Sequence, residues 1–151
     1  VTDVVGFARA EHDVLSLAAA LETGSSHPLA VAILGRAMTE GVPVPPTVDA
    51  KALAGKGVTA RVGGESVFLG SAKAAGEIVA LSPEESARVS ALNDEGKTVS
   101  VLVASSRVAG LIGMRDEPRP DAEAGIQALK AAGISALMLT GDNKRTAAAI
   151  A

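Results

Sequence analysis

The chain has 151 residues and a formal net charge of −3, and 48% of its residues are hydrophobic although Phe7 and Phe68 are its only aromatic residues. The length fits one ordinary domain, or one domain with part of a second, and the lack of cysteine excludes disulfides and thiolate metal sites. The acidic balance without a basic cluster argues against nucleic-acid binding, and no segment has the length of a membrane span or the form of a signal peptide.

Apolar spacing and proline or glycine breaks predict the first elements in chain order. We expect a strand, two helices, a stiff proline-rich connector and a short strand, over residues 1–8, 11–22, 28–40, 42–46 and 48–53. Pro28 suits the first turn of the second helix, where a backbone N–H is not needed, and Ser26 or His27 would cap that helix. The short strand ends at residues 54–57, Ala-Gly-Lys-Gly.

The sequence pattern in the middle of the chain, over residues 58–115, predicts two β-hairpins separated by two helices. Gly63-Gly64 supplies the positive φ angles of a tight turn, and Ser82-Pro83-Glu84-Glu85 is a capping box that opens a helix. The expected order is strand, strand, helix, helix, strand and strand, over residues 58–62, 65–69, 71–79, 82–96, 98–104 and 108–115. Antiparallel strands with helices laid on them make this part of the chain an α+β domain.

The pattern changes at residues 116–120, a charged joint that contains two prolines. A helix is expected over residues 121–132 and a strand over 134–139, and Thr140-Gly141-Asp142-Asn143 then precedes another helix. This is an α–β–α segment of a parallel sheet, in which ligands bind at the carboxyl ends of the strands. We therefore expect an α+β domain followed by an α/β fragment, over residues 1–115 and 116–151.

Two stretches of the first part could form a ligand site. His27 stands at a helix start, where its imidazole could stack on a base, and Glu22 lies five residues earlier, where its carboxylate could accept from an exocyclic amine. Gly55-Lys56-Gly57 could let backbone N–H groups approach an anion, although it is neither a Walker A loop nor a dinucleotide fingerprint. Each also has a plain structural interpretation: an exposed imidazole on a capped helix, a glutamate at a helix end and an ordinary turn.

In the second part, Asp142 follows Gly141 at the end of a predicted strand, where a carboxylate suits Mg²⁺ or a water near a phosphate. The plain alternative is an Asp-Asn turn or a helix cap. The two histidines of the chain lack the spacing of a histidine metal site.

Taken together, these pieces resemble the heavy-metal branch of the metal-transporting P-type ATPases. The His-Pro pair of residues 25–30, with Glu22 ahead of it, is the mark of that branch, and Thr-Gly-Asp is common to P-type pumps generally. The matching motifs are Ser-Ser-His-Pro-Leu-Ala, Gly-Lys-Gly-Val, Glu-Gly-Lys-Thr-Val, Arg-Asp-Glu-Pro-Arg-Pro-Asp and Met-Leu-Thr-Gly-Asp-Asn, at residues 25–30, 55–58, 95–99, 115–121 and 138–143. They follow the family's order and spacing over essentially the whole chain.

The resemblance implies a nucleotide-binding domain inserted into a phosphorylation domain of the haloacid-dehalogenase type. It implies that His27 packs beside adenine and that Glu22 faces the base. It also implies that the loop Gly55-Lys56-Gly57 borders the triphosphate or ribose and that Gly70 lines the same cleft. Thr140, Gly141 and Asp142 would then lie near the γ-phosphate and Mg²⁺.

Two departures from the family pattern bear on activity. The motif Asp-Lys-Thr-Gly-Thr, whose aspartate takes the phosphoryl group in this family, does not occur in the chain, and Ser71 follows Gly70 where the family usually has asparagine. We therefore expect the chain to be a fragment that binds ATP without completing phosphoryl transfer.

The resemblance further implies a parent pump that uses ATP and Mg²⁺ through an aspartyl-phosphate to export metal ions. This chain would be a cytoplasmic domain of that membrane protein, with the pump's phosphorylation, actuator and membrane domains as its partners. Residues 116–121 favour the zinc, cadmium and cobalt class slightly over the copper class. Two alternatives stay open: a fragment of a phosphatase of the dehalogenase superfamily, and a non-catalytic adenine-nucleotide sensor.

Overall fold

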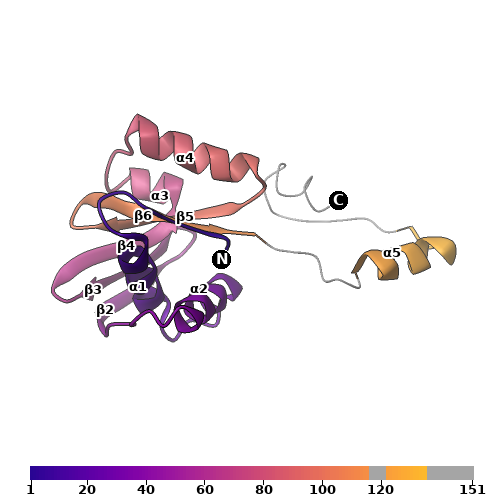
Figure 1. Cartoon of the computed structure of the whole chain (residues 1–151), viewed down its shortest axis with the longest axis horizontal. Helices are drawn as coiled ribbons and strands as arrows, with labels where there is room; N and C mark the ends of the chain where they lie inside the picture. The colour runs from indigo at the N-terminus through magenta and orange to yellow at the C-terminus, as the bar shows by residue number, and fades with distance from the viewer. Residues whose placement is uncertain (116–121, 136–151) are drawn as a thin grey trace.

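A six-stranded antiparallel sheet is the centre of the computed structural model, which describes residues 1–115 and 122–135 (Figure 1). The strands lie in the order β1-β6-β5-β4-β3-β2, so the first and the last of the described strands pair with each other at one edge of the sheet. The elements are β1 (Asp3–Gly6), α1 (Glu11–Glu22), α2 (Pro28–Thr39), β2 (Thr47–Leu53), β3 (Gly57–Val62), β4 (Glu65–Ser71), α3 (Ala72–Gly76), α4 (Pro83–Asp94), β5 (Thr98–Ala104), β6 (Arg107–Met114) and α5 (Ala122–Ala131).

Helices cover both faces of this sheet, with α1 and α2 on one face and α3 and α4 on the other (Figure 1). Successive side chains of a strand point to opposite faces, so β4 contributes Val67 and Leu69 to the core under α1 and Phe68 to the core under α3 and α4. In the same way, β5 contributes Leu102 to the first core and Val101 to the second. Burial on both faces explains why these strands are almost continuous apolar runs rather than alternating ones.

Both predicted hairpins are present, and their turns have the same backbone form. Gly63 and Gly64 have φ angles of 57° and 86°, as a two-residue hairpin turn requires. Ser105 and Ser106 have φ angles of 48° and 59° without being glycine. Hydrogen bonds hold that second turn, because the Ser105 backbone N–H donates to the Ser66 carbonyl at 3.2 Å and the Ser105 hydroxyl donates to the Glu65 carboxylate at 3.0 Å.

The helix caps follow the sequence signals. The predicted capping box is confirmed at α4, where the Ser82 hydroxyl accepts from the Glu85 N–H at 3.2 Å and the Glu85 carboxylate accepts from the Ser82 N–H at 2.6 Å. Pro28 occupies the first turn of α2 as predicted. Of the two residues proposed as its cap, His27 is the cap and Ser26 is not.

The predicted α+β fold is confirmed for the described residues, and only the ends of its elements differ. Strand β1 is shorter than the predicted 1–8, since it keeps only its four-residue pairing with β6. The helix predicted over 71–79 stops at Gly76, and residues 77–79 finish it as turns. Helix α5 agrees with the helix predicted over 121–132. Most of the strand predicted after it, and residues 140–143, lie outside the described residues, and the division of the chain near residue 115 stays a prediction.

Candidate functional site

A cleft of about 570 Å³ lies where the α1–α2 junction meets the ends of β3, β4 and β5. Its walls come from four parts of the chain that are distant in sequence. They are the helix junction (Glu22, Ser25, His27, Leu29, Ile33), the loop and strand ends of residues 52–58, and the strand-end residues Leu69, Gly70, Ser71, Thr98, Val99 and Ser100. The cleft therefore contains every residue of the first part that the sequence singles out as a candidate for nucleotide binding: Glu22, His27, Gly55, Lys56, Gly57 and Gly70.

Glu22 brings a carboxylate to the wall of the cleft. It is the last residue of α1 and is only partly exposed. Burial raises the pKa of the Glu22 carboxyl above its ordinary value, and the opposing effect of the neighbouring Ser25 offsets only part of that increase. A desolvated carboxylate of this kind gains most when a ligand donates hydrogen bonds to it.

His27 is held by the helix that it caps. Its Nδ1 accepts the Leu29 backbone N–H at 3.2 Å, so the side chain itself satisfies one of the free N–H groups at the start of α2. When Nδ1 accepts a hydrogen bond, a neutral imidazole carries its proton on Nε2. The helix cap therefore fixes both the ring and its tautomer at the mouth of the cleft.

Gly57 and Gly70 face each other across the β3–β4 pair and bring two backbones unusually close. A Cβ added at Gly57 would lie 2.1 Å from the Leu69 carbonyl oxygen, and one added at Gly70 would lie 2.1 Å from the Lys56 carbonyl oxygen. Gly57 also has a φ angle of 146°, which other residues rarely adopt. These glycines thus have a structural task of their own: they let residues 53–57 fold against the end of β4 and form one wall of the cleft.

Lys56 contacts a carboxylate at the rim of the cleft. Its ammonium forms an ion pair with Glu77, which follows α3, and both side chains are about half exposed, at 53% and 51%. The hydrogen bond from Lys56 holds the pKa of the Glu77 carboxyl below its ordinary value. The positive charge in this loop is therefore matched by a negative one.

The structure adds hydroxyl groups that the sequence analysis did not assign to the site: Ser25, Ser71, Thr98 and Ser100. Ser71 lies directly opposite Ser100 in the β4–β5 register, and its Oγ caps α3 by accepting the Ala74 N–H at 3.2 Å. Only the strand register, which the sequence does not show, brings these two serines together. Thr98 could have been assigned to the site from the sequence, since it belongs to the Glu-Gly-Lys-Thr-Val motif at residues 95–99.

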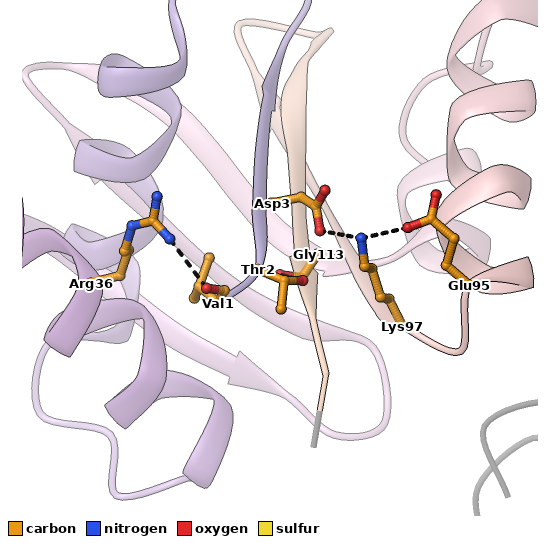
Figure 2. Close-up of polar contacts among 7 residues, drawn as sticks. All are labelled: Val1, Thr2, Asp3, Arg36, Glu95, Lys97 and Gly113. Carbon is orange, nitrogen blue, oxygen red and sulfur yellow. Dashed lines mark hydrogen bonds and ion pairs between the residues drawn. The ribbon is translucent and has the colours of Figure 1, made fainter. Parts of the chain in front are cut away.

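A polar cluster lies at the sheet edge where β1 meets β6 (Figure 2). Lys97 forms ion pairs with Asp3 at 2.7 Å and with Glu95 at 2.6 Å, and Arg36 donates to the Val1 carbonyl at 3.3 Å. Figure 2 shows Lys97 between the two carboxylates. Across the described residues, no three histidine, cysteine or acidic side chains gather as a metal site, and no helix there is long and apolar enough to cross a membrane. Thr140, Gly141 and Asp142 lie outside the described residues.

Comparisons with known proteins agree with the predicted resemblance. The copper-transporting P-type ATPase of Rhizobium leguminosarum bv. viciae is 41% identical over 151 residues, which are 99% of this chain and 18% of that protein. The zinc/cadmium/lead-transporting P-type ATPase of Escherichia coli is 40% identical over 141 residues, which are 93% of this chain and 19% of that protein. The chain thus spans about a fifth of the length of these relatives.

The solved structures that resemble this chain are also heavy-metal P-type ATPases. A zinc-transporting PIB-type ATPase matches with a TM-score of 0.77 and 35% identity, over 99% of this chain and 24% of that chain. The N-domain of a copper-transporting P-type ATPase matches with a TM-score of 0.65 and 28% identity, over 76% of this chain and 98% of that domain. A family model of the haloacid dehalogenase-like hydrolases matches residues 1–151. The chain therefore belongs to the haloacid dehalogenase-like hydrolase family, and within that family it is similar to the heavy-metal P-type ATPases.

Proposed function

We propose that this chain binds ATP in the cleft described above, as the cytoplasmic ATP-binding part of a pump that exports heavy-metal ions across a membrane. The observation that carries the proposal is the meeting of Glu22, His27 and the loop Gly55-Lys56-Gly57 around one cavity of about 570 Å³. A cavity of this size suits a ligand as large as a nucleotide.

The chemistry of the walls supports adenine at the helix-junction end. Glu22 can accept hydrogen bonds from the exocyclic amine, and the His27 ring can lie beside the base. Apolar side chains, among them Leu29, Ile33 and Leu69, supply the remaining surface for a flat ring in a domain with two aromatic residues. Gly70 and the 55–57 loop then border the ribose and phosphates, with Ser71, Thr98 and Ser100 as hydroxyl partners.

Phosphoryl transfer would take place outside this cleft. We propose that Mg²⁺ arrives with the nucleotide and that Asp142, next to Thr140 and Gly141 in the sequence, would help to hold it. When bound, the ion would neutralise phosphate charge. The chain has no Asp-Lys-Thr-Gly-Thr motif, so we expect this fragment to bind ATP and not to hydrolyse it.

The transported ion would be selected by parts of the pump that this chain does not contain. The resemblance of residues 116–121 favours the zinc, cadmium and cobalt class only slightly over copper, and relatives of both classes match, at 41% identity for a copper pump and 40% for a zinc/cadmium/lead pump. ATPase assays of the full-length pump with zinc, cadmium, cobalt and copper would separate the two classes. The same assays test the two alternatives, because a phosphatase or a nucleotide sensor would show no metal-stimulated ATP hydrolysis.

Calorimetric titration with ATP tests the binding proposal directly. We expect saturable binding with a Kd in the micromolar to millimolar range, or roughly −8 to −4 kcal/mol. His27→Gln should weaken it several-fold. His12→Gln is the matched control, because His12 is the only other histidine and lines a different cavity, near β1. Equal binding by wild type and His27→Gln would remove His27 from the site, and absence of binding by wild type would refute the proposal.

A further inference from the structure

We infer that Thr98 and Ser100 of β5 recognise the ribose hydroxyls of the bound nucleotide, so that the cleft prefers ribonucleotides to deoxyribonucleotides. This inference rests on the proposed function of the cleft and adds the residues that select the sugar. Both residues line the cleft. The observation behind the inference is that their two hydroxyl groups lie on the cleft face of β5 and have no hydrogen-bond partner among the described residues.

The strand register places both side chains on the cleft side of the sheet. Residues of a strand alternate between its two faces, so Thr98, Ser100 and Leu102 share one face. Leu102 packs on that face in the core under α1, and so does Met114, which lies opposite Thr98 in β6. Along β5, Leu102 is buried, Ser100 is partly exposed and Thr98 is exposed. The two hydroxyls therefore belong to the part of this sheet face that the helices leave open.

Neither hydroxyl is used inside the described fold. Ser71, which lies opposite Ser100 in β4, shows the contrast, because its Oγ accepts the Ala74 N–H at 3.2 Å and caps α3. Within the part of the chain that the structure describes, the side chains of Thr98 and Ser100 make no such bond. Each can therefore donate one hydrogen bond to a ligand and accept others from it.

The position of β5 in the cleft points to the sugar. A ribose carries a base, a phosphate group and a pair of hydroxyls in different directions. Under the proposed function, the base lies at Glu22 and His27 and the phosphates lie beside residues 55–57. That loop leads into β3, and β4 lies between β3 and β5, so β5 is the wall left for the pair of hydroxyls. Residues two apart in a strand are about 6–7 Å apart, so Thr98 and Ser100 can flank two adjacent hydroxyls.

The charges near this wall suit a neutral sugar better than a phosphate. Lys97 precedes Thr98 but lies on the other face of the sheet, where it forms an ion pair with Asp3 at 2.7 Å. Among the described residues that line the cleft, Lys56 is the only lysine or arginine, and it is paired with Glu77. Phosphate oxygens are charged acceptors, whereas sugar hydroxyls both donate and accept, as serine and threonine hydroxyls do. The wall at β5 therefore matches the ribose.

Four variants test this inference. Thr98→Val and Ser100→Ala remove the two hydroxyls with little change of shape. Thr47→Val and Ser66→Ala are the matched controls, because they remove hydroxyls from strands β2 and β4 outside the cleft. Each protein would be titrated by calorimetry with ATP, with AMP and with 2′,3′-dideoxy-ATP, which lacks both ribose hydroxyls. Thermal unfolding would establish that each variant is folded.

Each lost hydrogen bond should weaken binding roughly 2- to 10-fold. We therefore expect wild type to bind ATP more tightly than 2′,3′-dideoxy-ATP by at least that factor. Thr98→Val and Ser100→Ala should each weaken ATP and AMP, leave 2′,3′-dideoxy-ATP unchanged and so reduce the preference, while Thr47→Val and Ser66→Ala should keep it.

Equal binding of ATP and 2′,3′-dideoxy-ATP by wild type would overturn the inference, and so would folded Thr98→Val and Ser100→Ala variants that keep the full preference. Variants that weaken ATP and 2′,3′-dideoxy-ATP equally and spare AMP would also overturn it, because the hydroxyls would then act on the phosphates. Wild type that binds none of the three nucleotides would instead refute the proposed function of the cleft.

Discussion

Asp3 and Lys97 lie 94 residues apart in the sequence and 2.7 Å apart in the fold, where Asp3 Oδ2 meets Lys97 Nζ (Figure 2). Their side chains are 22% and 12% exposed. Lys97 also contacts Glu95 at 2.6 Å, so its charge joins the edge strand β1 to the loop that leads into β5. Thr98, the next residue, lines the cleft. The ion pair thus connects the start of the chain with one wall of the candidate site.

This ion pair should make stability depend on pH in the acid range. Burial opposes ionisation of Asp3 and is the largest single effect, but the hydrogen bonds with Lys97 and Thr2 and the positive charges of Lys97 and Arg88 together outweigh it, so the pKa of Asp3 lies below its ordinary value. A carboxyl whose pKa is lower in the folded than in the unfolded state stabilises the fold above about pH 4, and that stabilisation is lost as pH falls through the folded pKa. Free energies of unfolding in urea between pH 7 and pH 2 measure the effect.

The Asp3→Asn variant isolates this contribution. It should lower the free energy of unfolding at pH 7 and flatten its dependence on pH below about pH 5. Asp13→Asn is a suitable control, because Asp13 lies exposed in the first turn of α1. If Asp3→Asn kept the wild-type slope, the acid dependence would belong to other carboxyl groups.

Two glycine-to-alanine changes should shift the free energy of unfolding in opposite directions. Gly70→Ala would place a Cβ 2.1 Å from the Lys56 carbonyl oxygen, and backbone cannot move aside cheaply, so we expect a loss of about 3 kcal/mol or more together with weaker ATP binding. Gly35→Ala, within α2, meets no atom within 4 Å. It should stabilise the fold by about 0.5–1 kcal/mol, because alanine is the better helix former. Thermal and urea unfolding measure both, and a neutral Gly70→Ala would contradict the close approach.

The elements of this fold could be predicted from sequence because their signals are local. Pro28 marks the start of α2, Ser82 and Glu85 form a capping box, and Gly63-Gly64 is a hairpin turn. The cleft residues Glu22 and His27 were found by local placement and by resemblance to a family. Each of these features is determined by a few residues that are adjacent in the sequence.

The pairing of strands that no hairpin joins could not be predicted, because it depends on contacts between distant residues. Nothing near Ser71 in sequence indicates that Ser100 lies opposite it, whereas the predicted two-residue turn at Gly63-Gly64 already implies that Gly57 faces Gly70.

Glu22→Gln should separate stability from binding. Burial raises the pKa of the Glu22 carboxyl in the folded state, so the ionised form is less favourable in the fold than in the unfolded chain. The stabilisation that goes with a raised carboxyl pKa is present at low pH and is lost as pH rises through that folded value. A neutral amide avoids this loss, so Glu22→Gln should raise the free energy of unfolding at pH 7 by roughly 0.5–1 kcal/mol.

The same variant should bind ATP several-fold more weakly, since an amide is a poorer acceptor for the adenine amine than a carboxylate. Glu11→Gln is the control, because Glu11 is exposed at the other end of α1. Unfolding and calorimetry on the same samples give both quantities. A variant that loses both stability and binding would show that Glu22 supports the helix rather than the ligand.

The Lys56–Glu77 ion pair should limit how strongly the glycine loop attracts phosphates. Glu77 neutralises Lys56 at the rim of the cleft, and both groups face solvent, so the pair is weak and sensitive to salt. Glu77→Gln frees the ammonium and removes a negative charge near the proposed triphosphate. We therefore expect ATP to bind about 2- to 3-fold more tightly at low salt, with the gain shrinking as salt is added.

Lys56→Gln should do the opposite, weakening ATP binding about 2- to 3-fold at low salt, because it leaves Glu77 unpaired beside the phosphates. AMP provides the internal control, since it carries the base and fewer phosphate charges, and its affinity should respond less to either change. Calorimetric titration at two salt concentrations with both nucleotides measures this. If Glu77→Gln strengthened AMP and ATP binding equally, the charge would act on the base end of the cleft, and the phosphates would lie elsewhere than beside residues 55–57.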